Sequence, residues 1–240
     1  MNFQRGEILY FDKPLHWTSF NLVAKVRSAL CHKIGVRKLK VGHAGTLDPL
    51  ATGVVTICTG KATKQIDELQ AHVKEYVATL QLGATTPSFD LETSIDATFP
   101  TVHITKQRIQ EVLEQFKGKI EQIPPAFSAC KVDGHRAYNL ARKGKEVQLK
   151  AKTLIIDEID LQNFDSEAMQ MTIRVVCSKG TYIRALARDI GEALQSGAHL
   201  IALRRTKVGD IRVEDCMKMK DFSDWLEEQE IEKETESDND

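Results

Sequence analysis

Two hydrophobic periods divide the chain into expected strands and helices. In residues 74–83 the apolar positions alternate, so that Tyr76, Ala78, Leu80 and Leu82 share one side of a predicted strand. Comparable β-branched or alternating runs predict further strands at residues 6–13, 54–58, 154–156 and 169–177. Apolar residues at helical spacing predict helices over residues 19–30, 105–116 and 183–194, and a short helix after Thr59. We expect Thr18 or Ser19 to cap the first helix.

Residues 42–53 interrupt this pattern with a glycine-rich segment that holds one carboxylate. Three glycines and Pro49 exclude a continuous helix, so Asp48 is expected on a loop that enters the strand at 54–58. Glycine allows the backbone to approach a ligand closely, and a loop that also offers His, Thr and Asp suits a functional site. The alternative is a solvated turn, because Asp before Pro is common in turns. The pattern alone leaves both interpretations open.

Composition indicates a globular protein without a membrane anchor. The chain has 240 residues, 42% of them hydrophobic, which suffices for one large domain or two small ones. It contains no run of eighteen apolar residues and does not begin like a signal peptide, so we expect a cytoplasmic protein. Five cysteines are scattered singly, which predicts neither a disulfide framework nor a zinc site.

The net charge of −1 hides an uneven distribution. Eight of the last fourteen residues are acidic against one lysine, whereas residues 1–226 hold 32 basic and 26 acidic groups. We therefore divide the chain into a basic body over residues 1–226 and an acidic tail over residues 227–240, which is expected to be disordered. A basic body suits a polyanionic partner such as RNA. The tail either competes with RNA for the basic body or serves only solubility.

Basic residues concentrate in three places. Residues 31–40 hold five basic side chains and no acid, which suits either phosphate contact or a solvated face. Lys61 and Lys64 lie near a predicted helix start, where a lysine opposes the helix dipole and a bound anion would explain it. In residues 123–145 basic side chains alternate with the aromatic residues Phe127 and Tyr138, a combination typical of protein surfaces that bind nucleic acid.

The segment from His43 to Gly53, His-Ala-Gly-Thr-Leu-Asp-Pro-Leu-Ala-Thr-Gly, resembles the active-site segment of bacterial tRNA pseudouridine-55 synthases, the TruB family. Residues 177–184, Cys-Ser-Lys-Gly-Thr-Tyr-Ile-Arg, are similar to a second family motif. Residues 12–19 resemble a third, although His16 stands where the family usually has Gly. In residues 85–93 Asp90 matches the family, whereas Thr93 replaces a Gly. The likeness extends from about residue 6 to about residue 226.

The resemblance implies a fold and a set of roles. It implies an α+β pseudouridine synthase fold, with a mixed, mainly antiparallel sheet flanked by helices and an inserted RNA-binding thumb at about residues 124–152. Asp48 would be the catalytic group and Arg184 its ion-pair partner, although Arg184 could also be an exposed helix residue. Tyr76 would stack on the target uracil, although a strand Tyr is normally core. His43 would fill the space that the base leaves, although a lone His is more often structural. Further substrate contacts are expected from Tyr182, Leu203, Lys13, Lys64 and Asp90, and RNA contacts in the thumb from Lys131, Arg136 and Arg142.

The implied activity is isomerisation of uridine 55 in the tRNA T-loop, with Asp48 acting either as a nucleophile or as a base toward the ribose. The reaction is expected to need no cofactor, and the sequence offers no Walker loop, dinucleotide fingerprint or metal cluster. We expect a monomer that binds tRNA and no membrane or metal, without the C-terminal PUA domain that many relatives carry. Arg204 and Arg205 are expected to contact phosphate or to lie on the surface. The competing hypothesis is a tRNA-binding chaperone without catalysis; a glycosidase is disfavoured because Asp48 has no second carboxylate in its motif.

Overall fold

The computed structural model describes residues 1–128, 131–132, 135–137 and 149–232, with only the backbone of residues 131, 132, 135 and 136. The chain divides into two compact units. The first comprises Met1–Lys74 and Arg204–Asp240, and the second comprises Glu75–Leu203. Strand β12 (Ala198–Val208) begins in the second unit and ends in the first. No helix among the described residues is long and apolar enough to span a bilayer.

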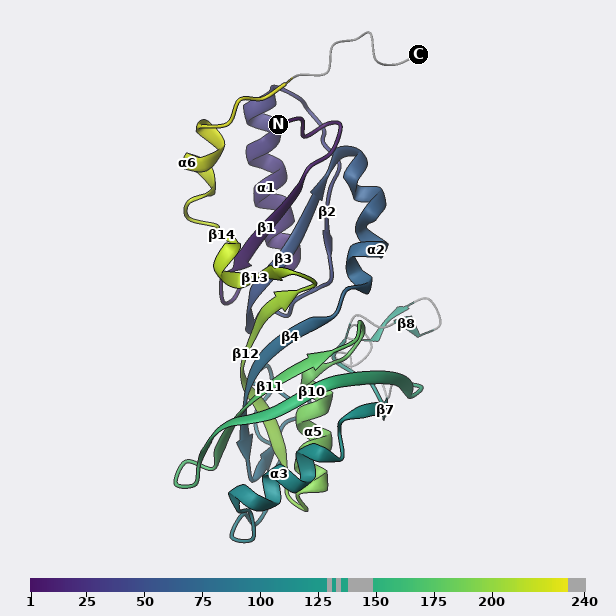
Figure 1. The fold of residues 1–240 in the computed structure, drawn as a ribbon, viewed down its shortest axis with the longest axis vertical. Helices are drawn as coiled ribbons and strands as arrows, with labels where there is room; N and C mark the ends of the chain where they lie inside the picture. Colours follow the sequence, from purple (N-terminus) through teal and green to yellow (C-terminus); the bar gives the residue numbers. More distant parts are fainter. Residues whose placement is uncertain (129–130, 133–134, 138–148, 233–240) are drawn as a thin grey trace. The chain divides into compact units, whose positions relative to one another are not determined.

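The first unit contains a sheet whose strand order is β14-β1-β3-β12, with β2 beside β3 and β13 beside β12. Strand β1 is antiparallel to β3 and parallel to β14, so the sheet is mixed. Helices α1 and α2 both contact β2, as Figure 1 shows. The elements of this unit besides β12 are β1 (Ile8–Lys13), α1 (Ser19–Ile34), β2 (Val41–Ala44), β3 (Ala51–Thr59), η1 (Gly60–Gln65), α2 (Ile66–Ala71), β13 (Ile211–Arg212), η2 (Val213–Asp215), β14 (Met217–Lys218) and α6 (Phe222–Glu227).

Helix α1 follows from its capping residues and its apolar stripe. The Thr18 side chain accepts a hydrogen bond from the Asn21 amide, and the Asn21 side chain bonds back to Thr18 in a capping box. Gly35 ends the helix in the left-handed conformation. The predicted helix is confirmed and extends to Ile34, and of the two predicted caps it is Thr18 that caps it. The buried stripe includes Leu22, Val26 and Leu30.

Alternation along β1 separates its two faces. Leu9, Phe11 and Lys13 are buried, whereas Asp12 on the other face is partly exposed. The Phe11 ring meets the Phe222 ring of α6 edge to face at 5.3 Å. Strand β3, by contrast, is buried at all but one of its positions, which is typical of a strand covered on both faces.

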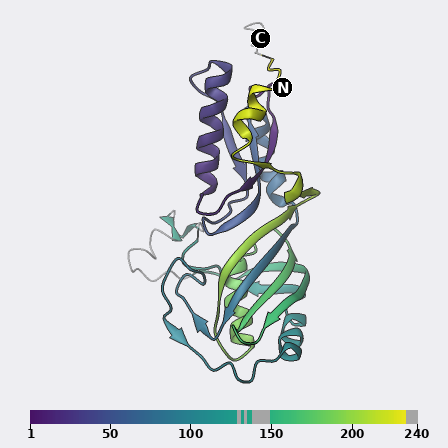
Figure 2. The same cartoon turned by 90° about the vertical axis from the view of Figure 1, so that its left-hand side faces the viewer.

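The second unit is a strongly twisted sheet with the order β12-β4-β11-β10-β7. Helices α3 and α5 contact each other, and Figures 1 and 2 show α5 against one face of the strands. Strand β10 pairs with β11 and β7 in antiparallel register. The elements are β4 (Lys74–Leu82), β5 (Ala84–Thr85), β6 (Ala97–Thr98), α3 (Lys106–Glu114), β7 (Gly118–Gln122), β8 (Lys131–Val132), β9 (His135–Arg136), β10 (Lys152–Asp165), β11 (Gln170–Cys177) and α5 (Ile183–Ala193).

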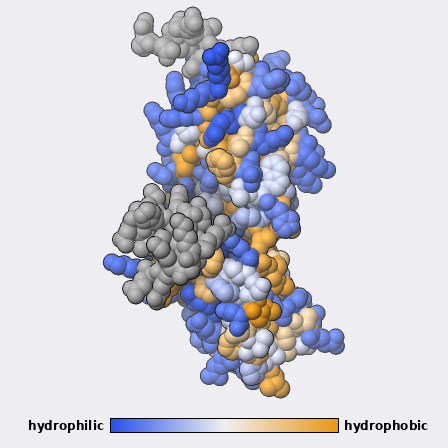
Figure 3. All heavy atoms as spheres, turned by 180° about the vertical axis from the view of Figure 1, so that it is seen from behind, coloured by the Kyte–Doolittle hydropathy of each residue, from blue (hydrophilic) through white to orange (hydrophobic). Residues whose placement is uncertain are grey.

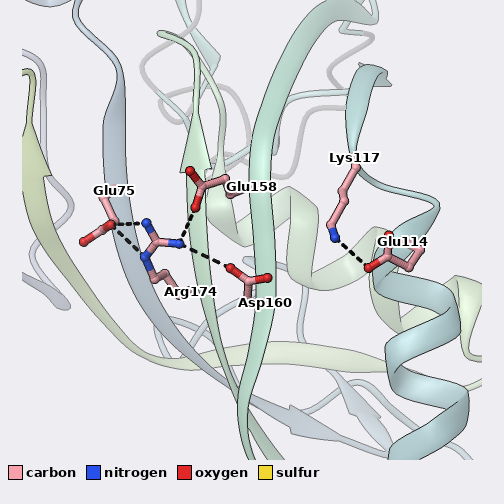
Figure 4. A network of polar contacts seen from close by, with 6 residues as sticks. All are labelled: Glu75, Glu114, Lys117, Glu158, Asp160 and Arg174. Atoms are coloured by element: carbon pink, nitrogen blue, oxygen red, sulfur yellow. Dashed lines mark hydrogen bonds and ion pairs between the residues drawn. The ribbon is translucent and has the colours of Figure 1, made fainter.

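The two faces of this sheet differ in polarity. The alternating residues of β4 and β11 bury one face, as the period of two predicted. On the other face Arg174 bonds the carboxylates of Glu75, Glu158 and Asp160 at 2.6 to 3.2 Å, joining β4, β11 and β10 (Figure 4). Cross-strand pairs of this kind stabilise the register of neighbouring strands.

Several features differ from the sequence-based expectation or extend it. Strand β12 was not predicted, and β10 is far longer than the expected residues 154–156. The first residues of the glycine-rich segment belong to β2 rather than to a loop. Glu227 closes α6, and the Met1 ammonium donates to the Glu230 carbonyl, so the described start of the acidic tail contacts the N-terminus. Within the predicted thumb, β8 and β9 form an antiparallel pair.

Candidate active site

Asp48 lies in the short loop that connects β2 to β3 in the first unit. Gly45 begins the loop with a φ of 88°, a conformation that favours glycine. The Asp48 carbonyl accepts a hydrogen bond from the Ala51 amide at 3.1 Å, which closes a turn through Pro49. The Asp48 side chain is partly exposed. The loop therefore presents a carboxylate to solvent from a tightly turned backbone.

The segment before α1 holds this loop from one side. The buried Ser19 hydroxyl accepts from the Leu47 amide at 2.9 Å and is 3.1 Å from the Leu47 carbonyl, to which it donates. The His16 amide donates to the Pro49 carbonyl at 2.8 Å. His16 has a φ of 65°, which explains why glycine suits this position. Ser19 thus fixes the Asp48 loop instead of capping the helix.

Arg205 of β12 holds the loop from a second side. Its guanidinium donates to the Val54 carbonyl at 2.7 Å, the Gly45 carbonyl at 3.1 Å and the Thr46 carbonyl at 3.4 Å. The side chain is only 1% exposed, so the expectation of a phosphate contact or a surface position is wrong for Arg205. A charge is tolerated there because backbone carbonyl oxygens surround it.

Gly53 allows β3 to approach β12 closely beside this arginine. Its φ is 112°, and a Cβ there would come within 2.1 Å of the Arg205 carbonyl oxygen. Any residue with a side chain at this position would force the backbones of β3 and β12 apart. The glycine that ends the motif therefore has a packing role that the sequence pattern did not reveal.

Lys13 and His43 add to the electrostatics around the loop. Lys13 is fully buried, and its Nζ donates to the carbonyls of Pro14 at 2.9 Å and Trp17 at 2.6 Å. Burial lowers the pKa of Lys13 to about 8, while Asp48 raises it and Arg205 lowers it. Burial and, to a lesser degree, Arg205 lower the pKa of His43, while a hydrogen bond with the Gly45 backbone raises it. The buried Nδ1 of His43 has no hydrogen-bond partner among the described residues. His43 is thus neutral near pH 7.

In the second unit, Arg184 is buried in the first turn of α5. Its Nε lies 3.5 Å from an Asp90 carboxylate oxygen, and its terminal nitrogens donate to the carbonyls of Ser88 at 3.2 Å and Phe127 at 2.9 Å. Arg184 is 5% exposed, so the alternative of an exposed helix residue is wrong. Asp90 also accepts from the Glu92 amide at 2.9 Å. Asp90 thus forms an ion pair with Arg184, and the substrate contact expected of Asp90 stays a prediction.

The remaining predicted site residues of this unit come from β4, β12 and the start of α5. Tyr76 is 8% exposed on the buried face of β4, a position compatible with both the core and the stacking interpretation. The Tyr182 amide donates to the Gln122 side chain at 2.9 Å, and its carbonyl accepts from the same side chain at 3.2 Å. Leu203 is partly exposed on β12.

Several predictions stay untested by the geometry. Asp48 belongs to the first unit and Arg184 to the second, so their pairing remains a prediction. Lys64 is exposed in η1. Lys131 and Arg136 face each other as backbone partners of β8 and β9, and Arg142 lies outside the described residues. Among the described residues no group of three His, Cys, Asp or Glu side chains could hold a metal ion.

Comparison with solved structures defines the class of fold. The chain is similar to one in the crystal structure of a Cbf5-Nop10-Gar1 complex, with a TM-score of 0.69 and 28% identity over 93% of this chain and 55% of that one. It is also similar to one in an H/ACA RNP bound to a substrate RNA containing 2′-deoxyuridine, with a TM-score of 0.65, 27% identity, and coverage of 93% of this chain and 54% of that one. The chain spans about half the length of these structures. The fold is that of a pseudouridine synthase, as predicted.

Sequence comparison then defines the family. The model for the TruB family pseudouridylate synthase N-terminal domain matches residues 32–183, and that for the tRNA pseudouridylate synthase B C-terminal domain matches residues 184–238. The tRNA pseudouridine synthase B of Phocaeicola vulgatus is 69% identical over 97% of this chain and 98% of its own. The Bacteroides thetaiotaomicron and Flavobacterium johnsoniae proteins of the same name are 67% and 51% identical over 97% and 92% of this chain, covering 98% and 96% of their own. The chain belongs to the TruB family of pseudouridine synthases, which are isomerases.

Proposed function

We propose that this protein converts uridine 55 of the tRNA T-loop to pseudouridine, with Asp48 as the catalytic group. The proposal is supported by high identity to proteins named tRNA pseudouridine synthase B. The observation that carries the assignment of Asp48 is the geometry of its loop. Three independent anchors, Ser19, the His16 amide and Arg205, hold a backbone that leaves the Asp48 side chain accessible. Such fixed positioning is what a catalytic carboxylate needs and what a solvated turn does not.

The reaction detaches uracil from C1′ of the ribose, turns the base and rejoins it through C5. Atoms and electrons balance within the substrate, apart from the C5 proton that is released to solvent and the proton that N1 gains. Asp48 acts either by attack on the ribose or the base, or by taking a ribose proton while uracil departs. Both routes require the carboxylate to lie close to the sugar.

The substrate base must leave the stack of the T-loop before it can react. Flipping costs a few kcal/mol, which stacking and phosphate contacts offset. We assign Tyr76 to stacking on the flipped uracil and His43, neutral near pH 7, to the space that it vacates. Arg184, held by Asp90 and two carbonyls, is assigned to orient Asp48, and Tyr182 and Leu203 to exclude water. We assign Lys13 to holding the segment before α1 rather than to direct contact with the substrate, because both carbonyls to which it donates belong to that segment.

The test compares wild type with Asp48→Ala on an unmodified T-stem-loop transcript labelled with tritium at C5 of uridine. Because C5 loses its hydrogen when the new bond forms, wild type should release tritium and Asp48→Ala should not, while both bind the RNA. Binding without release by either protein would leave only the non-catalytic RNA-binding hypothesis.

A further inference from the structure

The first unit contains a pocket whose lining includes no residue of the loop that carries Asp48. It has a volume of about 560 Å³, within the range of ligand pockets. The end of β1, the turn through Trp17, helix α1, the start of β3, Arg204 of β12 and the residues around β14 line it. All of these residues belong to the first unit.

The charge of this pocket is strongly positive. Arg204 bonds Asp12 through two nitrogens at 2.8 and 3.2 Å and the Thr52 hydroxyl at 3.1 Å, so the one carboxylate in the lining is already matched. The lining also contains Lys25, Lys218 and Lys220. All three are exposed, and none has an ion pair or side-chain hydrogen bond to another described residue. Three unmatched ammonium groups around one hollow favour a ligand with negative charge.

The pocket also contains an aromatic surface. Trp17 lines it and is partly exposed, and Met219 adds a second apolar side chain between the two lysines that flank it. A ring beside several lysines is the combination that binds nucleotides, because the base stacks on the ring while the lysines neutralise the phosphates. A simple anion would not need the ring. Figure 3 shows the hydrophilic character of much of the first unit on the face that it displays.

We propose that this pocket binds one nucleotide of the RNA substrate, with the base against Trp17 and the adjacent phosphates against Lys25, Lys218 and Lys220. The inference rests on the proposed function, because it assumes an RNA substrate. A strand of RNA is favoured over a free nucleotide because the three lysines come from α1 and from the two sides of Met219, and all are open to solvent. The pocket would add affinity without taking part in the chemistry.

The test uses the tryptophans of the chain, of which there are two. Trp225→Phe removes the other indole, which stacks on Phe222 in α6, and leaves Trp17 as the sole reporter. Full-length unmodified tRNA should quench Trp17 fluorescence in this background. Lys218→Ala/Lys220→Ala should weaken tRNA binding about 5- to 50-fold and reduce the slope of log K against log salt by about 1 to 2. The rate at saturating tRNA should stay within about twofold of wild type, because the pocket lining includes no residue of the loop that carries Asp48.

The matched control is Lys106→Ala/Lys119→Ala, which removes two exposed lysines of the second unit and should change neither affinity nor slope. Unchanged tRNA affinity and slope in Lys218→Ala/Lys220→Ala, with wild type forming pseudouridine, would overturn the pocket and leave the proposed function standing. Absence of pseudouridine from wild type would instead overturn the proposed function. Quenching by adenosine 5′-monophosphate alone, without quenching by tRNA, would identify a free-nucleotide site and also overturn the inference.

Discussion

Arg205→Met would test whether the buried guanidinium of β12 fixes the Asp48 loop. The substitution keeps an apolar stem of similar length and removes the donors to the Val54, Gly45 and Thr46 carbonyls. Hydrogen bonds to charged groups contribute about 1.5 to 3 kcal/mol each, and the two shorter ones dominate here. Relief of the buried charge offsets part of that loss. We therefore expect the free energy of unfolding to fall by about 2 to 4 kcal/mol, since the buried Val54 carbonyl and the partly buried Gly45 carbonyl lose their donor.

The effect on catalysis should exceed the effect on binding. A loop free to shift by about 1 Å lowers kcat by about 10- to 100-fold, whereas RNA contacts made elsewhere leave KM nearly unchanged. Urea unfolding and tritium release at saturating RNA measure the two quantities. Arg205→Lys should recover part of the stability, because one ammonium can bond some of the three carbonyls.

The matched control is Arg212→Met, which changes an exposed arginine of β13 and should alter the free energy of unfolding by less than about 0.5 kcal/mol. If Arg205→Met retained wild-type stability and kcat, the guanidinium would not be holding the loop and the argument would be refuted.

Two further predictions concern the same loop. Ser19→Ala should cost about 1 to 3 kcal/mol and lower kcat, because the buried Leu47 amide and carbonyl lose their partner; Thr18→Ala should cost about 0.5 to 2 kcal/mol as a lost helix cap and leave kcat unchanged. Equal kcat values for the two variants in tritium release would contradict this. The pKa of Lys13 is lowered to about 8 in the folded protein from 10.5, so the unfolded chain binds this proton more tightly. The stability that Lys13 contributes is therefore full above pH 10.5 and is lost as the pH falls through 8. Wild-type stability relative to Lys13→Met should therefore rise from pH 8 to 10.5 in urea unfolding; a flat difference would show that the lysine titrates normally.

Local periodicity predicted much of the secondary structure. The alternation at Tyr76, Ala78 and Leu80 predicted β4, and a capping residue followed by an apolar stripe predicted α1, because both signals act within a few residues. Strand β12 escaped prediction because its burial follows no single period: Ala198 to Leu200 are buried in succession, Ala202 is exposed, and Arg205 and Val208 are buried again.

The sequence likewise predicted one part of the candidate site and not the other. The glycine-rich segment drew attention to Asp48 from composition, and the family resemblance supplied the roles of Tyr76 and Arg184. The burial of Arg205 could not be predicted, because its partners are carbonyls of Gly45, Thr46 and Val54, about 150 residues earlier in the chain. Backbone acceptors leave no trace in the identity of the residues that carry them. The bonding of Ser19 to Leu47 was hidden for the same reason.

Site-resolved mapping of pseudouridine in full-length tRNA tests the central claim most directly. Unmodified tRNA would be incubated with wild type or with Asp48→Asn, which keeps the size of the side chain and removes its charge, and every uridine would then be assayed for conversion. The proposed mechanism predicts pseudouridine at position 55 with wild type and none with Asp48→Asn, although both proteins bind the tRNA. Conversion by Asp48→Asn at the wild-type rate, or modification of a different uridine by wild type, would contradict it.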